Sequence, residues 1–263
     1  SLLEMPRREQ GPVVYRHWDA MSKIKVYDFE GQYRSINIDN IANTGIFAFD
    51  GNWDRPEEEK FPFGIDVSWL IERSDGCVFL SLGAGAGQDV LQALQAGATE
   101  IHAVEVISHI NRMLLDGELA EFTGHFYRDP RVTVATEDAR AYAARFEGKF
   151  DLIYSLSSNT FAALASGSFA LAENYLFTTE AFADYWRALS DDGFMMMEHQ
   201  FYMPRLVASL VDALEAAGVE RPRSHFAVYD LPQMRRKMIL LSRQPLTDEV
   251  RNLAFGELTA EKF

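Results

Sequence analysis

The chain has 263 residues, which fits one large α/β domain with an appendage. Hydrophobic residues make up 48% and charged residues 24%, proportions that exclude a disordered or low-complexity chain. The 39 acidic and 25 basic residues give a formal net charge of -14. A surface this acidic repels phosphate backbones and anionic membranes, so it disfavours nucleic-acid binding and membrane association.

A single cysteine, Cys77, excludes a disulfide within the chain and a cysteine-rich zinc site, and it predicts a reducing, cytoplasmic setting. No apolar run approaches the roughly 18 residues that a membrane-spanning helix requires. No signal peptide is recognisable in residues 1–10, which are charged and contain Pro6. This absence carries little weight, because a chain that starts with Ser1 rather than Met is compatible with a piece of a longer protein.

Residues 1–60 are predicted to form a small antiparallel β-region. Polar and apolar residues alternate at residues 23–28, as in a half-buried strand. A short turn separates this strand from a second at residues 33–39, which makes a hairpin, and a third strand is expected at residues 44–49. The charged residues 54–60 predict a solvated linker to the next region.

Residues 61–243 alternate strand and helix patterns, which specifies an α/β fold with a Rossmann-like, doubly wound sheet. Strands are expected at residues 77–82, 100–106, 132–134, 150–154 and 194–197. Helices are expected from Asp89 to Gly97 and at residues 138–146, 179–189 and 204–217.

The last two predicted strands, at residues 225–229 and 237–241, leave no room for a crossover helix, so we expect them to pair antiparallel. A parallel sheet that ends in an antiparallel hairpin is typical of the class I methyltransferase variant of the fold. Residues 244–263 are expected to form a helical tail.

A glycine loop follows the first buried strand. Gly83, Gly85 and Gly87 permit a tight turn and let a ligand approach the backbone closely. The dinucleotide-binding fingerprint would need a glycine or alanine where this chain has Gln88, and the lysine of a P-loop is missing as well. The remaining G-x-G-x-G pattern is typical of loops that hold the methionine part of S-adenosylmethionine (SAM).

Acidic residues follow the next two strands. Glu105 lies about 20 residues after the loop, where a carboxylate accepts both hydroxyls of a ribose. Asp138 follows the third strand, and we expect it to accept a hydrogen bond from the adenine amine. The alternative to a donor site is a glycine turn with two solvated acids. The alternative for Asp89 is a structural role at the start of a helix. The predicted donor-binding residues are Gly83, Ala84, Gly85, Gly87, Asp89, Glu105, Val106, Asp138, Ala139 and Ser155.

Six segments match one known family: residues 82–87 (LGAGAG), 103–106 (AVEV), 129–132 (DPRV), 138–140 (DAR), 150–154 (FDLIY) and 173–182 (ENYLFTTEAF). Through them, residues 15–217 resemble the spermidine synthase-like proteins, a branch of the class I SAM-dependent transferases. The N-terminal hairpin with residues 49–51 (FDG) resembles that family's small β-domain. The resemblance implies SAM or decarboxylated SAM as the donor, a small-molecule acceptor and a homodimer.

Departures from that family bear on the reaction. Its aminopropyltransferases carry an aspartate in the glycine loop, where this chain has Ala86, and aspartates after the fourth strand, where it has residues 155–159 (SLSSN). Without these carboxylates, intact SAM meets less repulsion and a polyamine loses charge-assisted bonds. The sequence therefore favours methyl transfer over aminopropyl transfer from decarboxylated SAM. A third alternative is a nucleoside-binding scaffold without turnover.

The acceptor is expected beside the ends of the fourth and fifth strands. His199 is the candidate general base, with a hydrogen bond to a loop carbonyl as its alternative role. Tyr154 and Asn159 complete the predicted catalytic residues, and the predicted acceptor-binding residues are Ser157, Glu173, Tyr175 and Glu198.

The acceptor-binding residues have alternative roles. Tyr175 would pack on the sheet edge, Glu173 would cap a helix and Glu198 would be solvated. An aminopropyltransferase would instead use Asp89, Glu173 or Glu198 to anchor its amine. No metal site is predicted, because no metal-ligand spacing connects His17, His102, His109, His125 and His225.

Overall fold

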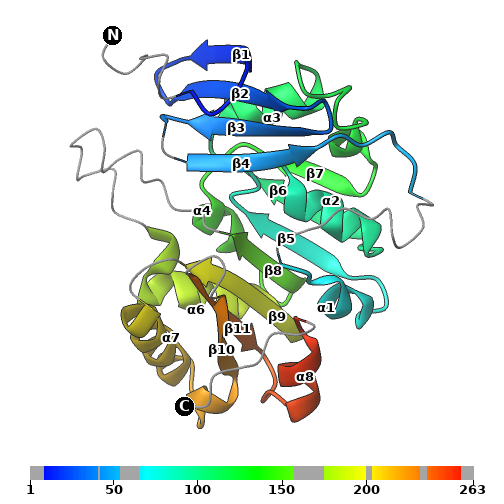
Figure 1. Ribbon diagram of the computed structural model, residues 1–263. Coiled ribbons are helices and arrows are strands. Elements are labelled where there is room, and N and C mark those ends of the chain that lie inside the picture. The colour runs from blue at the N-terminus through cyan, green and yellow to red at the C-terminus, as the bar shows by residue number, and fades with distance from the viewer. Residues whose placement is uncertain are drawn as a thin grey trace.

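The computed structural model describes residues 9–40, 42–53, 65–156, 175–199, 203–231 and 236–255. These residues form a four-stranded sheet and a seven-stranded sheet (Figure 1). The predicted linker at residues 54–60 lies outside the described residues. Within the described residues, no helix has the length and apolar character needed to cross a membrane.

The small sheet is antiparallel throughout and runs in the order β1-β2-β3-β4. Its strands are β1 (Val13–Trp18), β2 (Lys23–Phe29), β3 (Tyr33–Ile38) and β4 (Ala42–Phe47). The predicted hairpin corresponds to β2 and β3 and is confirmed. Strand β1 does not show in the sequence pattern, although its residues alternate between half-buried and exposed. Its outward side carries Val14 and Trp18, where an edge strand usually has polar residues.

The large sheet has the order β10-β11-β9-β8-β5-β6-β7. Its parallel strands are β5 (Val78–Leu82), β6 (Glu100–Val104), β7 (Val132–Ala135), β8 (Phe150–Leu156) and β9 (Leu189–His199). The last strand, β11 (Arg236–Ser242), lies between β9 and β10 (Phe226–Leu231) and is antiparallel to both. This is the Rossmann-like methyltransferase fold that the sequence predicts, with its antiparallel hairpin at the end.

Helices cover both faces of the large sheet (Figure 1). One face carries α1 (Ser68–Glu72), α2 (Gln88–Gln95), α3 (Ser108–Leu115) and α8 (Asp248–Leu253). The other carries α4 (Ala139–Ala143), α6 (Thr179–Ala188) and α7 (Met203–Ala216). In β9, Met195 and Met197 pack into one core and Met196 into the other, as expected for a strand covered on both sides.

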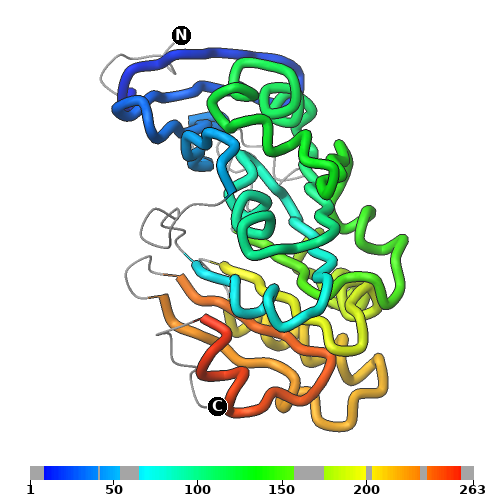
Figure 2. Tube along the Cα trace, turned by 90° about the vertical axis from the view of Figure 1, so that its right-hand side faces the viewer, coloured from blue at the N-terminus to red at the C-terminus, as the bar shows by residue number. Residues whose placement is uncertain are grey.

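The small sheet shares the core that lies under α2 and α3. Ile24, Val26 and Ile36 are fully buried in this core together with residues of the helices. Figures 1 and 2 both place the small sheet at one end of the molecule, beside α3. The backbone N–H of Ala86 in the glycine loop also donates to the hydroxyl of Thr44 in β4 at 3.1 Å. The small sheet therefore positions the glycine loop.

Candidate functional site

The glycine loop connects β5 to α2 at the carboxyl edge of the large sheet. Gly83, Gly85 and Gly87 have φ angles of 79°, 51° and 77°, in the left-handed region that favours glycine. The N–H groups of Gly83 and Ala84 both donate to the carbonyl of Val104 at 2.9 Å, which ties the loop to β6. A side chain on Gly87 would collide with the ring of Tyr127. The loop therefore needs its glycines for conformation and for close packing.

Glu105 lies directly after β6 and reaches back to this loop. One carboxylate oxygen accepts the N–H of Gly85 at 3.0 Å and the other accepts the N–H of Ile107 at 2.8 Å. Burial raises the pKa of Glu105, and these backbone donors oppose the rise. Each carboxylate oxygen has a second lone pair, so the group retains acceptor capacity for two hydroxyls. The next residue, Val106, is also predicted to bind the donor, and it is 47% exposed.

Asp138 caps α4. One oxygen of its carboxylate accepts the N–H of Ala141 at 2.8 Å, and the residue is exposed, whereas the neighbouring Ala139 is buried. The N–H of Glu105 donates to the carbonyl of Ala135 at 3.0 Å, so the ends of β6 and β7 lie side by side. The capping role explains Asp138 without a ligand, and its contact with adenine stays a prediction.

Asp89 is buried in the first turn of α2. It accepts hydrogen bonds from the hydroxyl of Ser81 and from the N–H of Val90, the latter at 3.0 Å. Burial raises the pKa of this carboxyl group to about 6. These contacts support the structural role considered for Asp89, and its place in donor binding stays a prediction.

Tyr127 was not anticipated from the sequence. Its side chain is 1% exposed, its ring packs against Gly87, and its hydroxyl has no hydrogen-bond partner among the described residues. Burial raises its pKa well above the usual value, and the carboxylates of Asp89 and Glu105 add to this effect. An aromatic residue shortly before a strand is normally assigned to the core, so no sequence signal distinguishes this hydroxyl.

Residues predicted to contact the acceptor lie at the carboxyl ends of β8 and β9. Glu198 is fully buried, and both its carboxylate oxygens accept from Nη1 of Arg236 on β11, at 2.8 and 3.1 Å. The alternative of a solvated Glu198 is therefore wrong, because β11 lies beside β9 and brings Arg236 to it. Burial raises the pKa of Tyr154, with contributions from the charges of Asp89 and Glu198, so its phenol keeps its proton at neutral pH.

The other predicted residues on this side differ in their surroundings. His199 ends β9, is 8% exposed and meets the ring of Phe177 edge to face at 4.9 Å. Ser155 is buried in β8, and Tyr175 is 55% exposed, which argues against its packing on the sheet edge. The predictions for Ser157, Asn159 and Glu173 lie outside the described residues. The general base assigned to His199 stays a prediction.

Comparisons with solved structures find the same architecture in three spermidine synthases. The enzyme from Thermotoga maritima has a TM-score of 0.63 at 17% identity, covering 92% of this chain and 75% of its own. A probable spermidine synthase from Corynebacterium glutamicum has a TM-score of 0.63 at 17% identity, covering 95% and 91%. A spermidine synthase in complex with the transition-state analogue AdoDATO has a TM-score of 0.59 at 16% identity, covering 90% and 74%.

This chain has the spermidine synthase fold. No protein-family model and no curated protein sequence matches it, so the likeness is one of fold. In this fold the carboxyl edge of the sheet carries the glycine loop, Glu105 and Tyr127. Ligands of open α/β sheets bind at that edge.

The groups gathered there fit a nucleoside sulfonium such as SAM. The three left-handed glycines have no side chains to shield the loop backbone at their positions, and Glu105 has acceptor capacity. The buried hydroxyl of Tyr127 is a donor without a hydrogen-bond partner among the described residues. An unpaired buried hydroxyl costs about 1–3 kcal/mol, which a polar ligand group would recover.

Proposed function

We propose that the protein is a SAM-dependent transferase that moves a methyl group to a small-molecule acceptor. The observation that carries the proposal is the junction of the glycine loop with Glu105, formed by the 3.0 Å bond from the N–H of Gly85. It sets the backbone of a glycine beside a buried carboxylate that has acceptor capacity left.

SAM would supply a methyl group on a positively charged sulfur, which needs positioning more than activation. Glu105 would hold the ribose hydroxyls, Gly83 and Gly85 would admit the methionine part, and Tyr127 would donate its hydroxyl proton to an oxygen of the donor. The protonated phenol of Tyr154 would face the acceptor as a neutral hydrogen-bonding group.

The state of the acidic residues supports methyl over aminopropyl transfer. An aminopropyltransferase without the usual aspartates would need Asp89, Glu173 or Glu198 to hold its cationic amine. Glu198 is already neutralised by Arg236, and Asp89 is bonded to Ser81 and Val90. An amine would have to displace a guanidinium or break a helix start to reach either carboxylate.

Aminopropyl transfer from decarboxylated SAM is the second candidate function. It is favoured by the comparisons, because two spermidine synthases and a probable spermidine synthase are among the solved structures with this fold, one of them bound to a transition-state analogue. A net charge of -14 would also suit a cationic acceptor.

Isothermal titration calorimetry with SAM and with decarboxylated SAM separates the two candidates. We expect tighter binding of intact SAM, and formation of S-adenosylhomocysteine with an acceptor from a small-molecule panel. A clear preference for the decarboxylated donor, with methylthioadenosine as product, would contradict methyl transfer. Tight SAM binding without either product across the panel would favour a non-catalytic scaffold. The homodimer and the cytoplasmic setting also stay predictions, and light scattering tests the first.

A further inference from the structure

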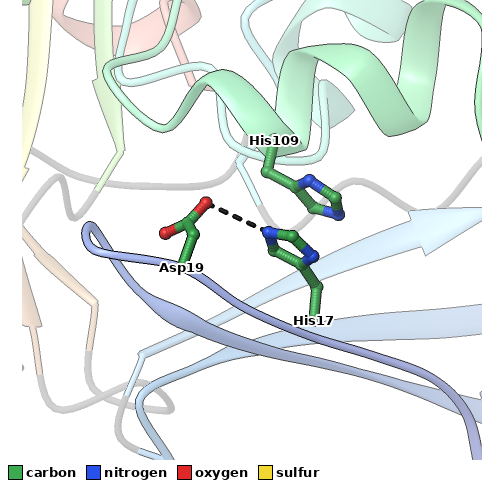
Figure 3. Close-up of side chains that lie close together, drawn as sticks. All are labelled: His17, Asp19 and His109. Carbon is green, nitrogen blue, oxygen red and sulfur yellow. Dashed lines mark hydrogen bonds and ion pairs between the residues drawn. The ribbon is translucent and has the colours of Figure 1, made fainter.

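Two histidines and an aspartate meet where the small sheet contacts α3 (Figure 3). His17 lies on β1, Asp19 directly follows this strand, and His109 lies in the first turn of α3. The imidazole rings are stacked, with centroids 3.3 Å apart and planes within 3° of parallel. Nε2 of His17 lies 3.1 Å from an oxygen of Asp19, and one ligand atom from each residue falls within 4.8 Å of the others.

We propose that this cluster binds a divalent transition-metal ion of the zinc type, outside the donor site. Two imidazoles and one carboxylate are a common zinc ligand set, with water in the fourth position. Zinc bonds of about 2.0–2.2 Å hold ligand atoms roughly 3.3 Å apart in a tetrahedron, so the two rings would have to tilt out of their parallel stacking to direct one nitrogen each at the same ion. The side chains of His17 and Asp19 are 28% and 32% exposed, which gives an ion access from solvent.

Asp19 is already oriented by its own backbone contacts. Its Oδ1 accepts the N–H groups of Met21 and Ser22 at 2.8 and 3.0 Å, and its Oδ2 points to His17. A carboxylate ligand is normally fixed by such secondary hydrogen bonds, which leave the other oxygen for the metal.

His109 is oriented by Tyr15. Nε2 of the ring lies 3.0 Å from the Tyr15 hydroxyl, which also accepts a hydrogen bond from Arg112 at 3.3 Å. When Tyr15 accepts the Nε2–H of His109, Nδ1 is left to ligate the metal, the arrangement usual for a histidine with a hydrogen-bonded second nitrogen.

The nearby positive charge is compensated. Arg112 lies 3.3 Å from Nε2 of His109, but its guanidinium also bonds both oxygens of Glu118, at 3.1 and 3.0 Å. With Glu118 and Arg112 paired, Asp19 supplies the net negative charge at the cluster.

Spacing along the sequence does not reveal this cluster, because His109 comes from the main domain and the other two residues come from the small sheet. A bound ion would cross-link these two parts. It would also fix the start of α3, whose preceding residue Ile107 bonds to Glu105.

Zinc titration of the full chain, purified without a histidine tag, tests the proposal. We expect one equivalent of Zn²⁺ by calorimetry, a thermal midpoint that rises with free Zn²⁺, and visible absorption bands when Co²⁺ replaces it. His17→Gln and Asp19→Asn should abolish zinc binding or weaken it strongly. The loss should exceed the factor of about 10–100 that follows when a hydrogen-bond partner of a ligand is removed. Tyr15→Phe should weaken it by about that 10–100-fold.

His225→Gln is the matched control, since that ring bonds the carbonyl of Ser242 away from the cluster. It should bind Zn²⁺ like the wild type. Circular dichroism without metal shows whether each variant folds. If a histidine or aspartate variant does not fold, Tyr15→Phe, which removes only one hydroxyl, still tests the proposal. Absence of zinc binding in the wild type, or equal affinity in the wild type, Asp19→Asn and Tyr15→Phe, would overturn the proposal whatever the transferase activity.

Discussion

The backbone N–H of Gly85 donates a 3.0 Å hydrogen bond to the carboxylate of Glu105, which joins the glycine loop after β5 to the acid after β6. The other oxygen of the same carboxylate accepts from Ile107, so Glu105 fixes two turns at once. The acid proposed to bind the ribose therefore also holds the loop that would face the donor.

Glu105→Gln should weaken both the donor complex and the fold. The variant loses the charge that strengthens bonds to hydroxyls, and its amide nitrogen must face a backbone N–H. We expect donor affinity to fall about 10–100-fold, in line with about 1.5–3 kcal/mol for hydrogen bonds to a charged group. Calorimetry measures the first effect and urea unfolding the second.

Glu100→Gln is the control for this experiment. Glu100 begins the same strand at its opposite end and pairs with Lys149 at 2.8 Å. Its substitution should leave donor affinity unchanged. Equal donor affinity in Glu105→Gln and the wild type would remove Glu105 from the donor site.

Gly87→Ala should destabilise the protein more than Gly97→Ala. Both glycines have left-handed φ angles, 77° and 85°, so alanine costs about 1–2 kcal/mol in conformational strain at each. A side chain at position 97 meets open space, whereas one at position 87 comes within 2.9 Å of Phe126 and collides with Tyr127. Urea unfolding of the two variants separates strain from collision. Similar losses of unfolding free energy in both would show that the loop shifts to avoid the collision.

The donor-side residues were accessible to sequence reasoning because their signal is local. A buried strand, three alternating glycines and an acid after the next strand occupy a short stretch, and parallel pairing brings their ends together. The roles of Tyr127, Arg236 and His109 could not be predicted from the sequence. Each acquires its role through a contact between distant segments, and no spacing rule predicts which side chain will fill such a place.

The N-terminal region shows the same division. Alternation predicted β2 and β3, whereas β1 has apolar residues on its outer side as well and so lacks a clean period of two. Asp138 fits its predicted position, but its capping bond to Ala141 supplies a second reason for an acid there. A local pattern therefore located the residue without deciding between the two roles.

Asp89 should make stability depend on pH. Its pKa rises from 3.8 to about 6 on folding, so between these values the folded state binds more protons than the unfolded state. Stability from this group is therefore present in full only below about pH 3.8 and is lost as pH rises through about 6. The shift corresponds to about 3 kcal/mol, at 1.36 kcal/mol for each pH unit.

Asp89→Asn removes this titration. The variant should gain up to about 3 kcal/mol relative to the wild type between pH 4 and pH 7.5, measured by urea unfolding at each pH. The comparison cancels other carboxyl groups, which are common to both proteins. A constant difference between the two proteins over this range would show that Asp89 titrates at its ordinary pKa.

The ion pair of Glu198 and Arg236 allows a further test, which bears on the reaction as well as on the fold. Arg236→Met leaves the fully buried carboxylate of Glu198 without its 2.8 Å partner, and we expect a loss of about 3–5 kcal/mol. Glu198→Gln with Arg236→Met removes both charges of the pair and should recover most of that loss in a double-mutant cycle. If Arg236 is what keeps Glu198 from serving as an amine anchor, Arg236→Met alone should also raise affinity for cationic acceptors such as putrescine, and the double variant should not. Putrescine affinity that is the same in all variants would show that the acceptor does not reach Glu198.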